Sequence, residues 1–198
     1  KREIVENYAR NLEGVNVLDT VPSPKTIEFR HKIQYPVSET KNSKRILAGY
    51  FKPKSHEIVN IKYCPIQPKI CDKIVEYIRE NAPKFDLSGY REKSHSGILR
   101  HIVIRASNYT NKNLVTLVVN IEKKTNNLTE FAKSIYEQFD EVSGVCVNYN
   151  TQKNNLILTN KSEYLFGEEF VEEKLCDYVF KIGSNTFFQV NPQSADNI

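Results

Sequence analysis

The sequence predicts an α+β fold, with a largely antiparallel sheet and two or three helices. β-Branched and aromatic runs follow one another in pairs separated by short polar turns, which is typical of hairpins. Segments with apolar residues at helical spacing lie between these pairs. The chain has 198 residues, of which 39% are hydrophobic and 26% charged, so it is long enough to bury a core without disulfides or a structural metal.

The first half of the chain is predicted to contain a short helix, three strands and a longer helix. Apolar residues recur at helical spacing over residues 2–12, which predicts the short helix. Alternating apolar residues predict a strand over 26–37. Pro68 suits the first turn of the longer helix, whose apolar stripe contains Cys71 and Ile74. The other strands of this half are expected at 46–52 and 57–63, around a turn at residues 53–56.

The second half is predicted to repeat this order of hairpin and helix. Its helix has the clearest pattern, because apolar residues recur at i, i+3, i+4, i+7, i+8 and i+11 from Leu128 to Phe139. Asn126 or Asn127 is expected to cap that helix. Neighbouring strands are expected to pair, which makes the sheet largely antiparallel. The predicted strands are 99–105 and 114–120, 143–150 and 156–160, and 175–182 and 186–190.

Positive charge is concentrated in residues 25–54. This basic segment carries eight Lys or Arg against Glu28 and Glu39, and aromatic residues are interleaved with the cations. Cations mixed with aromatic rings suit phosphate contacts and base stacking, and a solvated hairpin face is the alternative interpretation. The basic residues are Lys25, Arg30, Lys32, Lys41, Lys44, Arg45, Lys52 and Lys54.

Several common sites are excluded by the absence of their motifs. The seven glycines are isolated and form no phosphate-binding loop, and neither HExxH nor GxSxG occurs. None of the four cysteines forms a CxxC pair, which excludes a zinc ribbon and a thioredoxin site. No apolar run is long enough for a membrane helix and there is no secretion signal, so we expect a protein of the reducing cytoplasm. We also expect a monomer.

Five short elements carry a family resemblance. They resemble, in the same order, the YRNKxQYPV, GFYxxxSHxIV, CxIQ, LRHxxxR and SFFQVNP elements of bacterial RNA uracil-C5 methyltransferases. Each element is weak alone, but together they span nearly the whole chain. In this sequence they read FRHKIQYPV at 29–37, AGYFKPKSHEIV at 48–59, CPIQ at 64–67, LRHIVIR at 99–105 and TFFQVNP at 186–192.

The resemblance implies a piece of a three-part enzyme. Residues 1–182 would be the central α+β domain, and 183–198 the start of an S-adenosylmethionine-dependent methyltransferase domain. The family's nucleophilic cysteine and glutamate base lie downstream of the SFFQVNP element. We therefore expect no catalytic residue in this chain and no activity from it alone, and the absence of an initiator Met fits a fragment. The expected substrate is 23S ribosomal RNA; the alternatives are a transfer-RNA enzyme and a non-catalytic RNA-binding module.

The resemblance also implies individual site residues. Gln189 matches a family glutamine that contacts S-adenosylmethionine, although Ser194 stands where the family usually has a second glutamine. Cys64 matches the fourth ligand of a [4Fe-4S] cluster found in some members, whose other three cysteines precede the matched stretch. The expected phosphate contacts are Arg30, Lys32, Lys52 and Lys54, with Arg100 and Arg105 as second choices on opposite faces of their strand.

Overall fold

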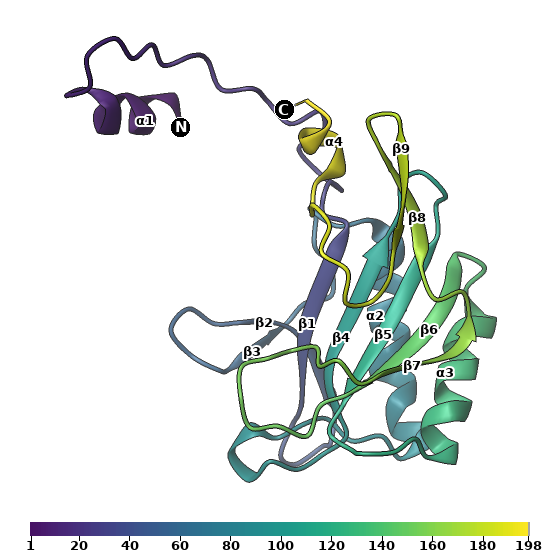
Figure 1. The fold of residues 1–198 in the computed structure, drawn as a ribbon. Helices are drawn as coiled ribbons and strands as arrows, with labels where there is room; N and C mark the ends of the chain where they lie inside the picture. Colours follow the sequence, from purple (N-terminus) through teal and green to yellow (C-terminus); the bar gives the residue numbers. More distant parts are fainter. Residues whose placement is uncertain (198) are drawn as a thin grey trace.

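The computed structural model describes residues 1–197, and its centre is a seven-stranded sheet in the order β3-β2-β1-β4-β5-β6-β7 (Figure 1). Every neighbouring pair is antiparallel except β5 with β6, which are parallel because a helix connects them. The predicted α+β class is therefore confirmed. The strands are β1 (Lys32–Glu39), β2 (Ile46–Phe51), β3 (Ile58–Asn60), β4 (Leu99–Ala106), β5 (Asn113–Val119), β6 (Val142–Tyr149) and β7 (Ser162–Gly167).

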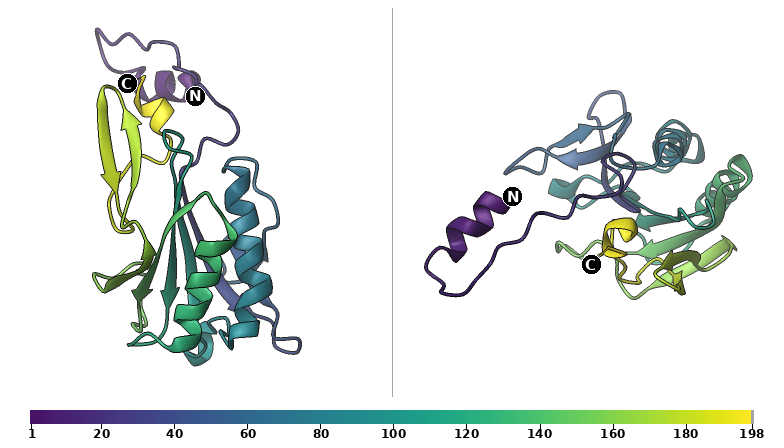
Figure 2. Two further views of the ribbon diagram at one scale, coloured as in Figure 1. Left: turned by 90° about the vertical axis from the view of Figure 1, so that its right-hand side faces the viewer. Right: turned by 90° about the horizontal axis from the view of Figure 1, so that it is seen from above.

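Two helices, α2 (Lys69–Asn81) and α3 (Asn126–Gln138), cover one face of this sheet (Figure 2). Both were predicted from apolar stripes, and those stripes are buried against the strands. Alternate residues of the central strands, such as Ile102 and Ile104, point toward the two helices and complete the core. The sheet and the two helices thus form the main hydrophobic layer. Short 3-10 turns at Ala82–Phe85 and Glu92–Ser94 connect α2 to β4.

The N-terminal cap of α3 is Thr125 and not the predicted Asn126 or Asn127. The Thr125 hydroxyl accepts a hydrogen bond from the backbone N–H of Leu128 at 3.3 Å, and Thr125 itself has an extended backbone. The two asparagines lie inside the first turn, so the prediction was wrong by one or two positions.

Replacing Thr125 by alanine is expected to lower the free energy of unfolding by about 0.5–2 kcal/mol, because one N–H of the first helical turn loses its acceptor. Urea unfolding followed by circular dichroism measures this loss. Asn126→Ala is the matched control and should cost less; a larger loss for Asn126→Ala would contradict the assignment of the cap.

The strand predicted over 26–37 begins later than expected, and the strand predicted over 156–160 does not form. Strand β1 begins at Lys32, because the backbone N–H groups of Glu28 and Arg30 donate to the carbonyls of Pro65 and Ile66 instead of joining the sheet. Residues 156–160 form a loop, not a strand, since the side-chain amides of two asparagines on and after β6 hold the loop's carbonyls. The strand that pairs with β6 at that edge is β7.

The chain from Val171 onward covers the opposite face of the sheet. The predicted strand 175–182 is a hairpin, β8 (Val171–Leu175) and β9 (Tyr178–Ile182), because Cys176 adopts a left-handed conformation with φ of 52° and turns the chain. Val171 and Ile182 pack on Leu114 of β5 in a second, smaller core. The predicted strand 186–190 is irregular, and the short helix α4 (Pro192–Ala195) follows it.

The first helix, α1 (Arg2–Ala9), forms as predicted but ends before residue 12, and none of its residues is buried. It lies apart from the sheet in all views (Figures 1 and 2). Among the helices of residues 1–197, none is long and apolar enough to cross a bilayer.

Candidate functional site

Gln189 lies on the irregular segment 183–191, which crosses the sheet where β1 begins and β4 ends. The backbone N–H of His31 donates to the carbonyl of Val190 at 2.7 Å, and the guanidinium of Arg105 donates to the carbonyl of Thr186. The side chain of Gln189 is exposed and makes no hydrogen bond within residues 1–197. The segment is therefore anchored through its backbone, which leaves the Gln189 amide free to donate and accept.

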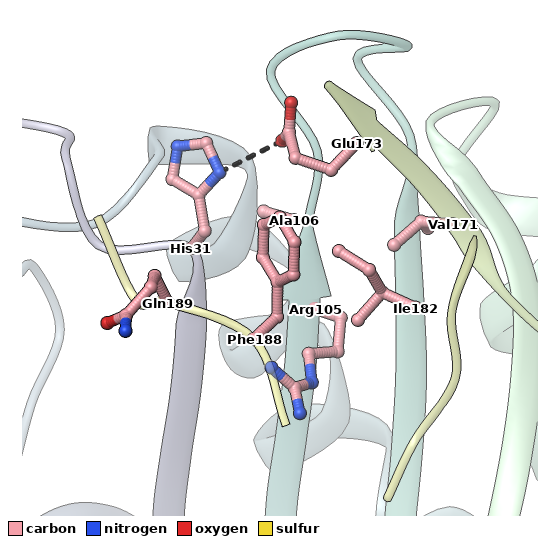
Figure 3. A pocket seen from close by; sticks show the side chains of 8 residues that line it. All are labelled: His31, Arg105, Ala106, Val171, Glu173, Ile182, Phe188 and Gln189. Carbon is pink, nitrogen blue, oxygen red and sulfur yellow. Dashed lines mark hydrogen bonds and ion pairs between the residues drawn. The ribbon is translucent and has the colours of Figure 1, made fainter. Parts of the chain in front are cut away.

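A buried pair, His31 and Glu173, lies beside this segment (Figure 3). The His31 Nδ1 and a Glu173 carboxylate oxygen are 3.2 Å apart, and each side chain is 5% exposed. Burial alone would raise the pKa of Glu173, but hydrogen bonds from His31 and from the backbone of Asn108 and Lys174 outweigh it and lower that pKa. Glu173 is thus an ionised carboxylate that ties β8 to the start of β1.

A cavity of about 190 Å³ opens next to this pair. A cavity of this size holds a few water molecules or one polar group of a ligand. The polar groups of its wall and the exposed amide of Gln189 close by could form hydrogen bonds with a polar ligand, such as one end of a cofactor. The wall consists of His31, Asn108, Tyr109, Glu173, Lys174, Pro192, Gln193 and Asp196.

Cys64 belongs to a hydrogen-bonded corner at the start of α2. The Asp72 carboxylate accepts from the backbone N–H of Cys64 at 3.4 Å and from the Gln67 amide at 2.6 Å, and Gln67 in turn accepts from the Tyr35 hydroxyl at 2.9 Å. Burial raises the pKa of Asp72. These contacts give the CPIQ element a structural role at the helix start.

Within residues 1–197 no group of three or more His, Cys, Asp or Glu side chains is arranged to hold a metal ion. Cys64 is 8% exposed and has no second cysteine at its side. The chain alone does not fit an iron-sulfur cluster, which needs four thiolate ligands. The role of Cys64 as a cluster ligand stays a prediction.

The basic candidates divide between two places. Lys52 and Lys54 lie at the tip of the β2–β3 hairpin, which projects from one edge of the sheet (Figure 1). Lys52 is ion-paired with Glu57 at 2.7 Å, whereas Lys54 is exposed on a turn. Arg30 and Lys32 lie instead at the start of β1, next to the segment that carries Gln189. The hairpin and the start of β1 therefore offer two separate positive surfaces.

Arg100 is bound to the protein itself. Its Nη1 donates to the carbonyl and side-chain oxygens of Asn150 and to the carbonyl of Gln152, and its guanidinium lies 4.6 Å from the centre of the Tyr90 ring. It is 4% exposed. An RNA contact by Arg100 stays untested, and this geometry makes it the least suitable of the cations.

Sequence reasoning missed Glu173 as part of the site. Glu173 lies in a strongly acidic stretch, where a solvated face is the simplest interpretation. The signal that could have found it is the alternation of Val171, Glu173 and Leu175, which places the carboxylate on the apolar face of β8. An acid on the buried face of a strand requires a partner, which His31 provides.

No family model matches the chain. Its sequence is 31% identical over 201 residues to an uncharacterized RNA methyltransferase of Fusobacterium nucleatum, covering 100% of this chain and 43% of that protein. It is 32% identical over 209 residues to an uncharacterized RNA methyltransferase of Leptospira interrogans, covering 100% of this chain and 53% of that protein. The chain thus spans about half the length of the curated relatives that it matches.

The fold has a solved counterpart in the Pyrococcus abyssi tRNA (uracil-54, C5)-methyltransferase in complex with S-adenosyl-L-homocysteine. The TM-score is 0.78 at 24% identity, and the match covers 99% of this chain and 44% of that one. This likeness establishes the fold. The sequence matches are to proteins named RNA methyltransferases, which agrees with the resemblance carried by the five motifs, and the chain is similar to RNA methyltransferases over its full length.

Proposed function

We propose that this chain is part of an S-adenosylmethionine-dependent methyltransferase that methylates C5 of a uridine in RNA. The observation that carries the proposal is Gln189, which the family motif assigns to the cofactor. Its amide is exposed and unbonded on a segment held by His31 and Arg105. The proposed substrate is 23S ribosomal RNA. Transfer RNA is the second candidate, because the solved counterpart is a tRNA enzyme.

The reaction needs a thiolate that adds to C6 of the uracil, which makes C5 nucleophilic toward the methyl group. A base then removes the C5 proton, and the electron pair of that C–H bond restores the C5–C6 double bond as the thiolate leaves C6. S-adenosylmethionine, when bound, supplies the methyl group. Burial raises the pKa of the Cys71 thiol, and it raises that of Cys146 to about 11, so neither is a thiolate at neutral pH. Cys176 is exposed, but the neighbouring Asp196 carboxylate raises the pKa of its thiol.

These three cysteines are therefore poor nucleophiles, and Cys64 is buried. We propose that the attacking cysteine and the base lie in another part of the same protein. This chain would then supply the RNA surface and one cofactor contact. The monomeric state and cytoplasmic location expected from the sequence are retained as part of the proposal.

Methyl transfer from labelled S-adenosylmethionine to RNA tests this division of roles. The 198-residue chain should transfer no methyl groups, while the longer protein that carries it should label uridine-containing RNA. Turnover by the chain alone would contradict the assignment of the nucleophile elsewhere, and no labelling by the longer protein would contradict the proposed function.

A double charge reversal, Lys52→Glu with Lys54→Glu, is expected to weaken RNA binding by the chain about tenfold or more at low salt, because two cations of the β2–β3 hairpin become anions. Fluorescence anisotropy with labelled RNA at several salt concentrations measures the loss, and the salt dependence should become shallower. Lys84→Glu with Lys133→Glu is the matched control at the α2 and α3 side. Equal RNA affinity for wild type and the hairpin variant would refute the hairpin as an RNA surface.

A further inference from the structure

The described part of the chain buries three arginine side chains, and they differ in what neutralises them. Arg79 forms an ion pair with Glu76 and donates to two further oxygens. Arg100 donates to three oxygens of residues 150 and 152 and lies over an aromatic ring. Arg105 donates only to the carbonyl of Thr186. Arg105 is thus the least compensated of the buried cations.

The guanidinium of Arg105 is buried without an anion. The residue is 3% exposed, its Nε has no hydrogen-bond partner, and no carboxylate of residues 1–197 lies within ion-pair distance. Burial lowers the pKa of Arg105 to about 10, and no charged neighbour offsets this effect, so the group is still protonated at neutral pH. Burying an uncompensated charge destabilises a fold, so its presence points to a partner from outside the chain.

Two further cations adjoin Arg105. Lys32 is directly opposite Arg105 in the β1–β4 register, so both side chains leave the same face of the sheet. Burial lowers the pKa of Lys32, and the positive charges of Arg105 and Arg30 lower it further. The Arg30 Nε donates to the carbonyl of Lys32 at 3.0 Å, while its terminal nitrogens make no hydrogen bond within residues 1–197. Three positive side chains therefore meet with no negative one between them.

The carboxylate of Glu173 does not neutralise the three cations Arg30, Lys32 and Arg105. Glu173 is bonded to His31, and Figure 3 shows the Arg105 side chain directed away from that pair. Gln189 lies on the same segment as Phe188 and Thr186. The uncompensated charge is thus concentrated immediately beside the residue proposed to contact the cofactor.

We propose that Arg30, Lys32 and Arg105 form a binding site for one phosphodiester of the RNA, here called the phosphate seat. Lys32 and Arg30 are only half-buried, so solvent reaches them, and in this proposal the Lys32 ammonium and the terminal Arg30 nitrogens contact the phosphate oxygens. Arg105 is buried and attracts the phosphate through its positive charge. The identity of the anion rests on the proposed function. The seat would fix the RNA backbone next to Gln189, whereas the β2–β3 hairpin would bind elsewhere on the RNA.

The test is the variant Arg105→Gln in the chain of residues 1–198, with a labelled single-stranded RNA as the probe and no cofactor present. RNA affinity should fall about tenfold at low salt, and the slope of log K against log salt should become smaller by about 0.7. Removing the uncompensated charge favours the fold, while losing the bond to the Thr186 carbonyl disfavours it, so the free energy of unfolding should stay close to that of wild type. Arg105→Lys should keep most of the affinity.

Three controls separate the outcomes. Arg79→Gln removes another buried arginine, which is compensated by Glu76, and should lower stability without changing RNA affinity. Lys133→Gln removes an exposed cation on α3 and should change neither. Lys32→Gln, at a half-buried position, should weaken RNA binding and replaces Arg105→Gln if that variant does not fold.

Unchanged RNA affinity in both Arg105→Gln and Lys32→Gln would overturn the phosphate seat. So would an Arg105→Gln variant that binds S-adenosylhomocysteine more weakly but RNA equally well, because the anion would then be the cofactor's carboxylate. Since these measurements use binding alone, the seat can fail while methyl transfer by the longer protein still supports the proposed function.

Discussion

Replacing Glu173 by alanine is expected to lower the free energy of unfolding by about 3–5 kcal/mol at neutral pH. The carboxylate is buried and accepts hydrogen bonds from His31, from the backbone of Asn108 at 2.8 Å and from that of Lys174 at 3.0 Å. Its removal leaves these buried donors without an acceptor. An unsatisfied buried donor destabilises the folded state more than the loss of an exposed hydrogen bond does. Denaturant unfolding of wild type and Glu173→Ala measures the loss.

Comparing wild type with Glu173→Gln shows how the stability contributed by the Glu173 carboxylate depends on pH. The folded state lowers the pKa of Glu173, so the unfolded state binds the proton more readily. The stabilisation by the ionised carboxylate is therefore fully present above the ordinary glutamate pKa, near 4.5, and is lost as the pH falls through the lower folded-state value. The stability difference between wild type and Glu173→Gln should shrink on acidification over that window. A difference that is constant from pH 7 to pH 3 would contradict the assignment.

Replacing Arg100 by methionine is expected to lower the free energy of unfolding by about 2–4 kcal/mol and to leave RNA affinity unchanged. Its Nη1 holds the carbonyls of Asn150 and Gln152, where the chain leaves β6 for the loop that covers the sheet. Methionine keeps most of the side-chain volume but leaves those buried oxygens without a donor. Thermal or urea unfolding and RNA anisotropy, measured on the same samples, separate the two effects. Weakened RNA binding without loss of stability would restore Arg100 as an RNA contact.

The helices and central strands could be predicted because their patterns are local. The apolar stripe from Leu128 to Phe139 has one geometric solution, a helix packed on the sheet, and α3 forms there. The parallel pairing of β5 with β6 could not be predicted from neighbour order, since it depends on α3 crossing over the face of the sheet.

The errors near the site come from contacts between distant parts of the chain. The turn at Cys176 needs a left-handed residue, and nothing in the residue type signals one, because glycine and asparagine are the usual choices. Gln189 was assigned to the cofactor through a motif, and that role stays a prediction. Glu173 was missed because its partner, His31, lies 142 residues away, and Arg105 was only a second choice because strand periodicity does not reveal a missing counter-ion.

The most direct test of the central proposal is the release of tritium from RNA that carries [5-³H]uridine. Methylation at C5 replaces the hydrogen on that carbon, so the longer protein that carries this chain should release one tritium into water for each methyl group transferred from S-adenosylmethionine. Methyl transfer without tritium release would place the methyl group on another atom of the RNA and contradict the account. Equal release and transfer, both lost when S-adenosylmethionine is omitted, is the result that we predict.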